Sequence, residues 1–405
     1  MQTKVLSFRD HLQTILNNRD FSSEYASFLL PSEEKILSDS IKLADKLSDF
    51  QNIAIIGIGG SNLGTVAIYD ALRKHIPNKG VYFFDTTDTE YTLTTLLDAV
   101  EKKLIAGEKL ILTVISKSGT TTESIALAST IYNIFIAKYK NQIEIVTISD
   151  FNSKLDLLAE EEWWKRLHIQ KMVGGRYSVF TNVGIFPLTF MGIDTKELVR
   201  GAQKAIDDFL IDPENHQSTN VALGLYNEFP KRNLFQHWFF SKKLENLGKW
   251  YRQLLAESIG KEKADGTSVG ITPTVAIGTI DLHSVAQLEI AHSDDRSIAI
   301  VEETETDEHI IRESPFMNIL PDIRGKSFGK IMRSGAEGFR SALITRKVPV
   351  YSYELSTDTP YDIGYWLQGK MLEVALLGYL FDINPFDQPN VEEYKTGMRR
   401  FLENE

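Results

Sequence analysis

The stretch KLILTVISKSGTTTES, residues 109–124, decides the fold that the sequence predicts. Residues 110–115 form a short apolar run rich in β-branched side chains, which is typical of a buried parallel strand. The run ends at a hydroxyl-rich turn, and residues 125–139 then follow a helical pattern. A strand that enters a helix through such a turn directs backbone N–H groups outward at the positive end of the helix dipole. The stretch therefore predicts an α/β protein with an anion site at this turn.

The side chains of the turn suit the oxygens of a phosphate monoester. Ser116, Ser118 and Thr121 supply hydroxyl groups, and Lys117 supplies a charge-assisted donor. The alternative is an ordinary helix start, in which Ser/Thr capping and Glu123 in the first turn satisfy the helix. The turn alone does not decide between the two.

Similar strand-to-helix patterns continue on both sides of this stretch. Further strands are predicted at residues 53–58, 81–84 and 143–148, and a second series at residues 234–240, 274–278, 297–301 and 348–353. Helical patterns interleave with them, including residues 194–210, 242–259 and 365–381. This alternation predicts two doubly wound parallel sheets of the flavodoxin-like kind, with ligands at the carboxyl ends of the strands.

The expected division of the chain follows from these patterns. Two α/β domains are predicted at residues 49–200 and 201–388. A polar-faced helical segment, residues 1–48, is expected to pack over the first domain, and residues 389–405 are expected to form a C-terminal helix. The acidic segment at residues 302–308 is interpreted as a solvated loop.

Length and composition agree with this division. At 405 residues the chain exceeds the usual size of a single hydrophobic core, so two domains are expected. The formal net charge of −11 argues against nucleic acid or an anionic membrane as a partner. The chain has no Cys, which suits a reducing cytoplasm and excludes thiolate metal sites. No apolar run approaches the length of a membrane span.

A glycine turn at residues 57–64, GIGGSNLG, favours a competing function. It follows a strand and opens a helix, and Asp85 ends the next strand, as in a dinucleotide-binding fingerprint. However, Asn62 stands where the third glycine of that fingerprint belongs. A glycine loop that brings Ser61 close to a sugar or phosphate fits the spacing better.

Three further segments carry candidate catalytic residues. Arg176 follows two glycines, which allow the backbone to approach a ligand, although a surface arginine in a turn is the commoner case. Gln253 and Glu257 are four residues apart, so they share one face of the helix predicted at residues 242–259. Glu257 lies in the last turn, where the negative end of the helix dipole disfavours the carboxylate and suits a general base. Most helix glutamates are nevertheless solvated.

Two other residues carry weaker signals when they are taken alone. His283 lies at a strand-to-helix turn, where a structural role is the commoner one. Lys395 would ordinarily be a surface lysine. The histidines form no metal-binding pattern, so no metal is expected.

Taken together and in order, these segments resemble the glucose-6-phosphate isomerase family, in its compact bacterial type. The resemblance extends from about residue 53 to residue 395. It is carried by IGIGGSNLG, SKSGTTTES, VGGRYSVFTNVG, AESIGK, GTIDLHS and FDQPNVEEYK, of which VGGRYSVFTNVG and FDQPNVEEYK are highly specific. Departures are small: Asn390 stands where a glycine is common, and Ser118 replaces a usual threonine.

The resemblance implies a role for each matching residue. Glu257 would move a proton between C2 and C1 of the sugar, Arg176 would stabilise the intermediate, and His283 with Lys395 would assist ring opening. The implied binding residues divide into a phosphate group (Ser116, Lys117, Ser118 and Thr121) and a sugar group (Gly60, Ser61, Gln253 and Gln388). Family members are usually homodimers with composite sites, in which the histidine comes from the neighbouring subunit.

The implied function is the reversible isomerisation of glucose 6-phosphate and fructose 6-phosphate through a cis-enediolate, in glycolysis and gluconeogenesis. The reaction needs no metal or redox cofactor. Two alternatives remain: a non-catalytic sugar-phosphate-binding regulator of the same sugar isomerase (SIS) fold, and a nucleotide-dependent oxidoreductase. Retention of Glu257, Arg176 and His283 argues against the regulator, since binding alone requires no base. Activity on mannose 6-phosphate stays open.

Overall fold

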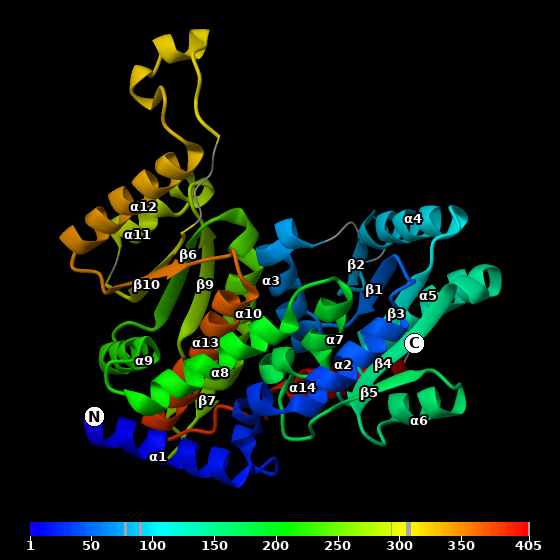
Figure 1. Ribbon diagram of the computed structural model, residues 1–405. Coiled ribbons are helices and arrows are strands. Elements are labelled where there is room, and N and C mark those ends of the chain that lie inside the picture. Colours follow the sequence, from blue (N-terminus) through cyan, green and yellow to red (C-terminus); the bar gives the residue numbers. More distant parts are fainter. Residues whose placement is uncertain (77–78, 89–90, 293, 305–308, 404–405) are drawn as a thin grey trace.

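The first of two parallel sheets contains the stretch that decides the fold (Figure 1). The computed structural model describes residues 1–76, 79–88, 91–292, 294–304 and 309–403. The strands of the first sheet are β1 (Asn52–Ile56), β2 (Gly80–Phe84), β3 (Leu110–Ile115), β4 (Ile143–Asp150) and β5 (Lys165–Ile169). They are parallel and lie in the order β2-β1-β3-β4-β5. This is the strand order of flavodoxin-like folds, as predicted.

The second sheet repeats this topology. Its strands are β6 (Leu234–Phe240), β9 (Thr272–Ile277), β10 (Arg296–Glu303) and β11 (Val350–Leu355), and all neighbours are parallel. Their order is β11-β10-β6-β9. If β6, β9, β10 and β11 are counted as strands 1 to 4 of the second sheet, their order from β9 to β11 is 2-1-3-4. The first four strands of the first sheet have the same order. The prediction of two doubly wound α/β units is confirmed.

The helices cover both sheets and fill the space between them (Figure 1). The α-helices are α1 (Gln2–Asn18), α2 (Glu34–Lys46), α3 (Leu63–Leu72), α4 (Tyr91–Ile105), α5 (Thr122–Tyr139), α6 (Lys154–Glu161), α7 (Asn182–Phe190), α8 (Thr195–Ile211), α9 (Gln217–Glu228), α10 (Glu245–Ile259), α11 (Ala286–Ala291), α12 (Phe328–Thr345), α13 (Pro360–Phe381) and α14 (Val391–Glu403). Short 3-10 helices that matter for the site are η2 (Gly59–Ser61), η5 (Gly175–Phe180) and η7 (Ile280–His283). Between α10 and β9, the strands β7 (Lys261–Glu262) and β8 (Ser268–Val269) form a small antiparallel pair.

One hydrophobic core joins the two units. It includes Ile53 and Ile55 of β1, Phe235 and Phe239 of β6, and Leu254 of α10, all fully buried. Helix α10 packs against α3 of the first unit as well as against β9 of the second. Helix α10 therefore lies between the two units, and Glu257 lies on this helix. The domain boundaries at residues 200 and 201 stay a prediction, and α8 spans them.

Three expectations need correction. Strand β5 was not predicted, because its sequence KRLHI is short and largely polar. Helix α2 packs on α7 of the first unit as expected, but α1 packs against α8 and α13, and Lys4 pairs with Asp382 at 3.1 Å. The acidic segment is only partly a loop. Glu302 and Glu303 end β10, where they pair with Arg340 and Lys243, while residues 305–308 lie outside the described residues.

Over the part of the chain that the structure describes, no helix combines the length and the apolarity that crossing a membrane would need.

Candidate active site

The strand order of the first sheet brings two polar turns together. The order reverses between β1 and β3, and the crevice at such a reversal is where open α/β sheets bind ligands. Residues 57–61 follow β1, and residues 116–121 follow β3. Because Ile56 pairs in register with Val114, the two turns leave the sheet side by side. The predicted glycine turn and the predicted phosphate turn thus lie next to each other at the point where the strand order reverses.

The turn after β3 is not an ordinary capped helix start. Thr121 occupies the N-cap position of α5, but its side chain makes no capping bond. Its hydroxyl instead shares a hydrogen bond of 2.9 Å with the hydroxyl of buried Ser116. Gly119 has a left-handed backbone (φ +68°), which allows the chain to turn sharply within this loop. The first N–H groups of α5 are therefore left without a cap from Thr121, as an anion site requires.

Lys117 binds the loop that follows β5. Its Nζ donates to the backbone carbonyl of Lys171 at 2.7 Å. Burial lowers the pKa of Lys117, and the neighbouring carboxylate of Asp150 partly opposes this shift. A phosphate dianion in the turn would favour the charged form of Lys117 in the same way. Ser118 is exposed, and its Oγ accepts the N–H of Thr120 at 3.3 Å.

The glycine turn after β1 lies directly against the segment that carries Arg176. A Cβ atom on Gly60 would lie 2.2 Å from the carbonyl carbon of Gly175, so only glycine allows this approach. The Ser178 hydroxyl donates to the carbonyl of Gly60 at 3.1 Å and fixes the contact. On the other side, η2 contacts α10, and Ser61 ends η2. The turn therefore connects the first sheet to the candidate catalytic residues.

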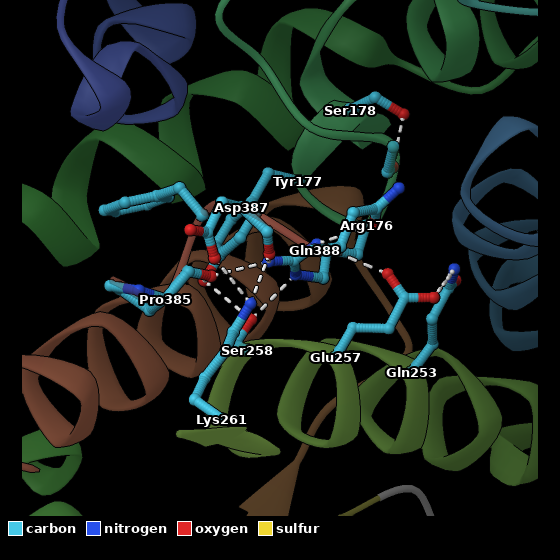
Figure 2. A network of polar contacts seen from close by, with 12 residues as sticks. Arg176, Tyr177, Ser178, Gln253, Glu257, Ser258, Lys261, Pro385, Asp387 and Gln388 are labelled. Atoms are coloured by element: carbon cyan, nitrogen blue, oxygen red, sulfur yellow. Dashed lines mark hydrogen bonds and ion pairs between the residues drawn. The ribbon is translucent and has the colours of Figure 1, made fainter. Parts of the chain in front are cut away.

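Arg176 is not a surface arginine, since only 1% of its side chain is exposed. Figure 2 shows its guanidinium at the centre of a polar network. Its five contacts go to the Ser258 hydroxyl (2.7 Å from Nε), Glu257 Oε2 and Gln388 Oε1 (3.3 and 3.1 Å from Nη1), and the carbonyls of Pro385 and Asp387 (2.7 and 2.9 Å from Nη2). A guanidinium has five N–H donors, so every one of them has an acceptor.

Glu257 is fixed from two sides. One carboxylate oxygen accepts from Arg176, and the other accepts from Gln253 Nε2 at 2.9 Å. This bond confirms that Gln253 and Glu257 share a helix face. The Glu257 side chain remains 30% exposed, so a ligand in the crevice can reach it. A fixed carboxylate beside a buried cation is a pair that can remove a proton and stabilise the resulting anion.

Several further residues of this network, such as Ser258, Tyr177 and Asp387, lie within the quoted motifs but have no role assigned from the sequence. Ser258 accepts from Arg176 and shares a hydrogen bond of 3.1 Å with the Tyr177 hydroxyl. Burial raises the pKa of Tyr177, so its proton remains available for this network. The carbonyls of Pro385 and Asp387 come from the loop before α14. These contacts join segments that are 81 to 211 residues apart, which no local pattern reveals.

His283 and Lys395 lie apart from this network. His283 is exposed at the end of η7, after β9 of the second sheet. Lys395 lies on α14 and pairs with Glu392 of the same helix at 2.7 Å. The structure therefore brings together Gly60, Gln253, Glu257, Arg176 and Gln388, and it sets the phosphate turn beside them by the strand order. It does not bring His283 or Lys395 into contact with them within one chain.

The two parallel sheets and the polar turns at the reversal point define a doubled α/β protein with a candidate ligand site where the strand order reverses. The chain is 31% identical over 385 residues to a glucose-6-phosphate isomerase of Thermus thermophilus, an alignment that covers 92% of this chain and 89% of that protein. The chain belongs to the phosphoglucose isomerase family, whose model matches residues 33–403.

Solved structures agree with the fold. A hypothetical protein from Thermus thermophilus superposes with a TM-score of 0.89 at 27% identity, over 98% of this chain and 94% of that one. A tagatose-6-phosphate ketose/aldose isomerase from Escherichia coli superposes with a TM-score of 0.53 at 12% identity, over 90% of this chain and 94% of that one. The second likeness concerns the fold alone.

Proposed function

We propose that this chain interconverts glucose 6-phosphate and fructose 6-phosphate, with Glu257 as the base that carries the proton between C2 and C1. Membership of the phosphoglucose isomerase family supports the reaction. The observation that carries the assignment of the base is the Glu257–Arg176 pair, in which a partly exposed carboxylate meets a guanidinium that is almost fully buried. Gln253 holds the second carboxylate oxygen and so sets its direction.

The charges of this pair suit proton transfer next to a carbonyl. A hydrogen on carbon beside an aldehyde or ketone is weakly acidic, and its removal puts negative charge on the carbonyl oxygen. When Glu257 takes the proton it becomes neutral, so its hold on the Nη1 group of Arg176 weakens. The same N–H can then donate to the enediolate oxygen. The positive charge of Arg176 thus faces the Glu257 carboxylate before the transfer and the enediolate after it.

The phosphate supplies binding energy far from the reacting carbons. We assign it to the turn after β3, with Lys117 and the hydroxyls of Ser116, Ser118 and Thr121. The uncapped start of α5 supports this assignment. Gly60, Ser61, Gln253 and Gln388 are the proposed contacts of the sugar hydroxyls. In this scheme the first predicted domain, residues 49–200, holds the phosphate, and the second, residues 201–388, supplies the base.

In this scheme, the histidine for ring opening comes from a second subunit. Closed sugar rings need an acid and a base before C2 becomes acidic, and these roles fall to His283 and Lys395. Among the described residues, the hydrogen-bond partners of Arg176 and Glu257 do not include exposed His283 at the end of η7, which supports a homodimer in which each site takes its histidine from the partner. We propose the cytoplasm as the compartment, in keeping with a chain that has no Cys.

The test is turnover of fructose 6-phosphate to glucose 6-phosphate in the presence of a chelator, for wild type, Glu257→Gln and Glu262→Gln. The Gln variant at 257 keeps shape and hydrogen bonding but cannot accept the proton, so its rate should fall by roughly 10³ or more. Exposed Glu262 is the matched control and should stay near wild type. An inert wild type that still binds the sugar phosphate would favour the non-catalytic regulator. A Glu257→Gln variant close to wild type would remove Glu257 from the role of base.

A further inference from the structure

Lys261 is a buried cation that the proposed mechanism does not use. It follows Gly260, which ends α10, and begins β7, four residues after Glu257. Only 7% of its side chain is exposed, although lysine is among the residues least often buried. Its ammonium donates to the carbonyl of Asp387 and to the Asp387 carboxylate, the latter at 2.7 Å. Removing the ammonium group from water costs free energy, so its burial is expected to serve the structure or the reaction.

The Asp387 carbonyl is shared between two cations. It accepts from Lys261 Nζ and also from Arg176 Nη2, the latter at 2.9 Å (Figure 2). Lys261 and Arg176 are therefore linked through a single oxygen, and the guanidinium of Arg176 also contacts Glu257. Burial lowers the pKa of Lys261, and the charge of Arg176 acts in the same direction, while Asp387 and Glu257 oppose it. Two cations and two carboxylates thus form a single charge-balanced group.

The loop that Lys261 holds also carries sugar-site residues. The carbonyls of Pro385 and Asp387 and the side chain of Gln388 all accept from Arg176. Lys261 also binds Asp387, so the loop is held by two cations. If Lys261 is lost, the Asp387 carboxylate loses its cationic partner; this side chain is 49% exposed and belongs to the residue whose carbonyl binds Arg176. That carboxylate can then compete with the enediolate for the guanidinium.

We infer that Lys261 is a positioning residue for the isomerisation: it holds the loop of residues 385–388 and neutralises Asp387, so that Arg176 keeps its charge for the reaction intermediate. Lys261 acts through Asp387 and does not touch the substrate. The inference rests on the proposed role of Arg176 and Glu257. It goes beyond that role because it adds a second cation and assigns a purpose to Asp387.

The experiment is a double-mutant cycle with Lys261→Met and Asp387→Asn, assayed for kcat and KM with fructose 6-phosphate. Lys261→Met should lower kcat about tenfold or more and change KM less than about threefold, because the intermediate is affected more than the substrate. Asp387→Asn removes the carboxylate that Lys261→Met leaves without a partner. The kcat of the double variant should therefore be several-fold higher than that of Lys261→Met. Lys263→Met, two residues further along the chain, is the matched control and should resemble wild type.

Each other outcome overturns the inference. A Lys261→Met variant with wild-type kcat, or a double variant no more active than Lys261→Met, would show that Asp387 does not need this partner. If Lys261→Met does not fold, Lys261→Gln keeps an N–H donor for the loop without the charge, and the same comparison with Asp387→Asn applies. Wild-type turnover in the same assay tests the proposed function separately: an inert wild type defeats that function, whereas an active wild type with an unaffected Lys261→Met defeats the inference alone.

Discussion

Arg176 donates all five of its N–H groups to acceptors of the protein. Three of these acceptors, at Ser258, Pro385 and Asp387, bind Nε and Nη2, and they fix the plane of the guanidinium. The other two, Glu257 and Gln388, share Nη1. A substrate oxygen that approaches Nη1 must therefore replace one of these two contacts. Since Glu257 becomes neutral when it accepts a proton, its contact is the one that weakens during the reaction.

Lys117 should contribute to the phosphate-dependent part of the transition-state stabilisation. Replacing it by Met removes a charge-assisted contact of about 1.5–3 kcal/mol, so kcat/KM for fructose 6-phosphate should fall by about 10- to 100-fold. Inhibition by inorganic phosphate should weaken in parallel. Steady-state kinetics with phosphate as the competing ligand measures both effects.

The matched control for this variant is Lys138→Met, at the far end of α5, where the lysine side chain is 63% exposed. It should leave kcat/KM unchanged. Equal behaviour of the two variants would contradict the assignment of the phosphate to the turn after β3.

Candidate residues could be predicted where a local pattern carries them. The spacing of Gln253 and Glu257 indicated a shared helix face, and the two now share a hydrogen bond of 2.9 Å. The partners of Arg176 could not be predicted in this way, because Ser258 lies 82 residues away and Pro385 209 residues away. The positions of these partners depend on the packing of the two α/β units. The sequence of a single segment does not determine that packing.

Among the strands of the first sheet, the sequence indicated the apolar ones and missed only the polar strand β5. Strand β3 is buried along its whole length and has the apolar sequence LILTVI. Strand β5, which pairs with β4 alone in its sheet, has the sequence KRLHI and an exposed first residue. Strand β2, at the other edge of the sheet, has the apolar sequence GVYFF and is predicted, so the polar sequence of β5 is the reason that it resembles a loop. Polar contacts to its neighbours stabilise it instead.

One such contact makes the stability of the first unit depend on pH. Asp156 of α6 is 2% exposed and accepts from the N–H of Asn152 and from His168 of β5, both at 2.9 Å. Burial alone would raise the pKa of Asp156, but these hydrogen bonds and the charges of His168 and Arg166 lower it on balance below its ordinary value of 3.8. Its stabilisation is therefore present above that value and is lost as the pH falls through the lowered pKa.

Asp156→Asn should reduce the free energy of unfolding at pH 7 by about 1–3 kcal/mol, because a charged acceptor in a buried network is lost. The difference from wild type should shrink once the pH falls below about 4. Urea unfolding at a series of pH values measures this difference in the free energy of unfolding. Exposed Asp207→Asn is the control and should show no such convergence. A constant difference between Asp156→Asn and wild type across this range would contradict the coupling.

For the whole molecule, the two sheets share a strand order but differ in what their turns carry. The first sheet carries the hydroxyl-rich turn, whereas α10 of the second unit carries Glu257, which pairs with Arg176 of the first unit. The segment before α12 projects from the body (Figure 1), and its exposed apolar residues include Ile310, Phe316 and Ile319. Exposed apolar groups of this size often mark an interface, which agrees with the proposed homodimer.

A composite site makes a specific prediction for mixed dimers. Glu257→Gln and His283→Ala should each be nearly inactive alone. In a mixed dimer with shared sites, one site combines the intact Glu257 of one chain with the intact histidine of the other. About half of randomly formed dimers are mixed, so co-refolded equal amounts should regain about a quarter of wild-type activity. If each site takes both residues from one chain, mixing restores nothing, and that result would contradict the composite site.

The most direct measurement is the deuterium content at C2 of glucose 6-phosphate formed from fructose 6-phosphate in D₂O, followed by NMR at initial rates with a chelator present. Proton transfer through Glu257, whose side chain is 30% exposed, allows the carried proton to exchange with solvent before it reaches C2. We therefore expect deuterium in a substantial part of the wild-type product, and we expect both turnover and exchange to be lost in Glu257→Gln. A wild-type product without deuterium at C2 would indicate a direct hydride shift and would contradict the proposed role of Glu257.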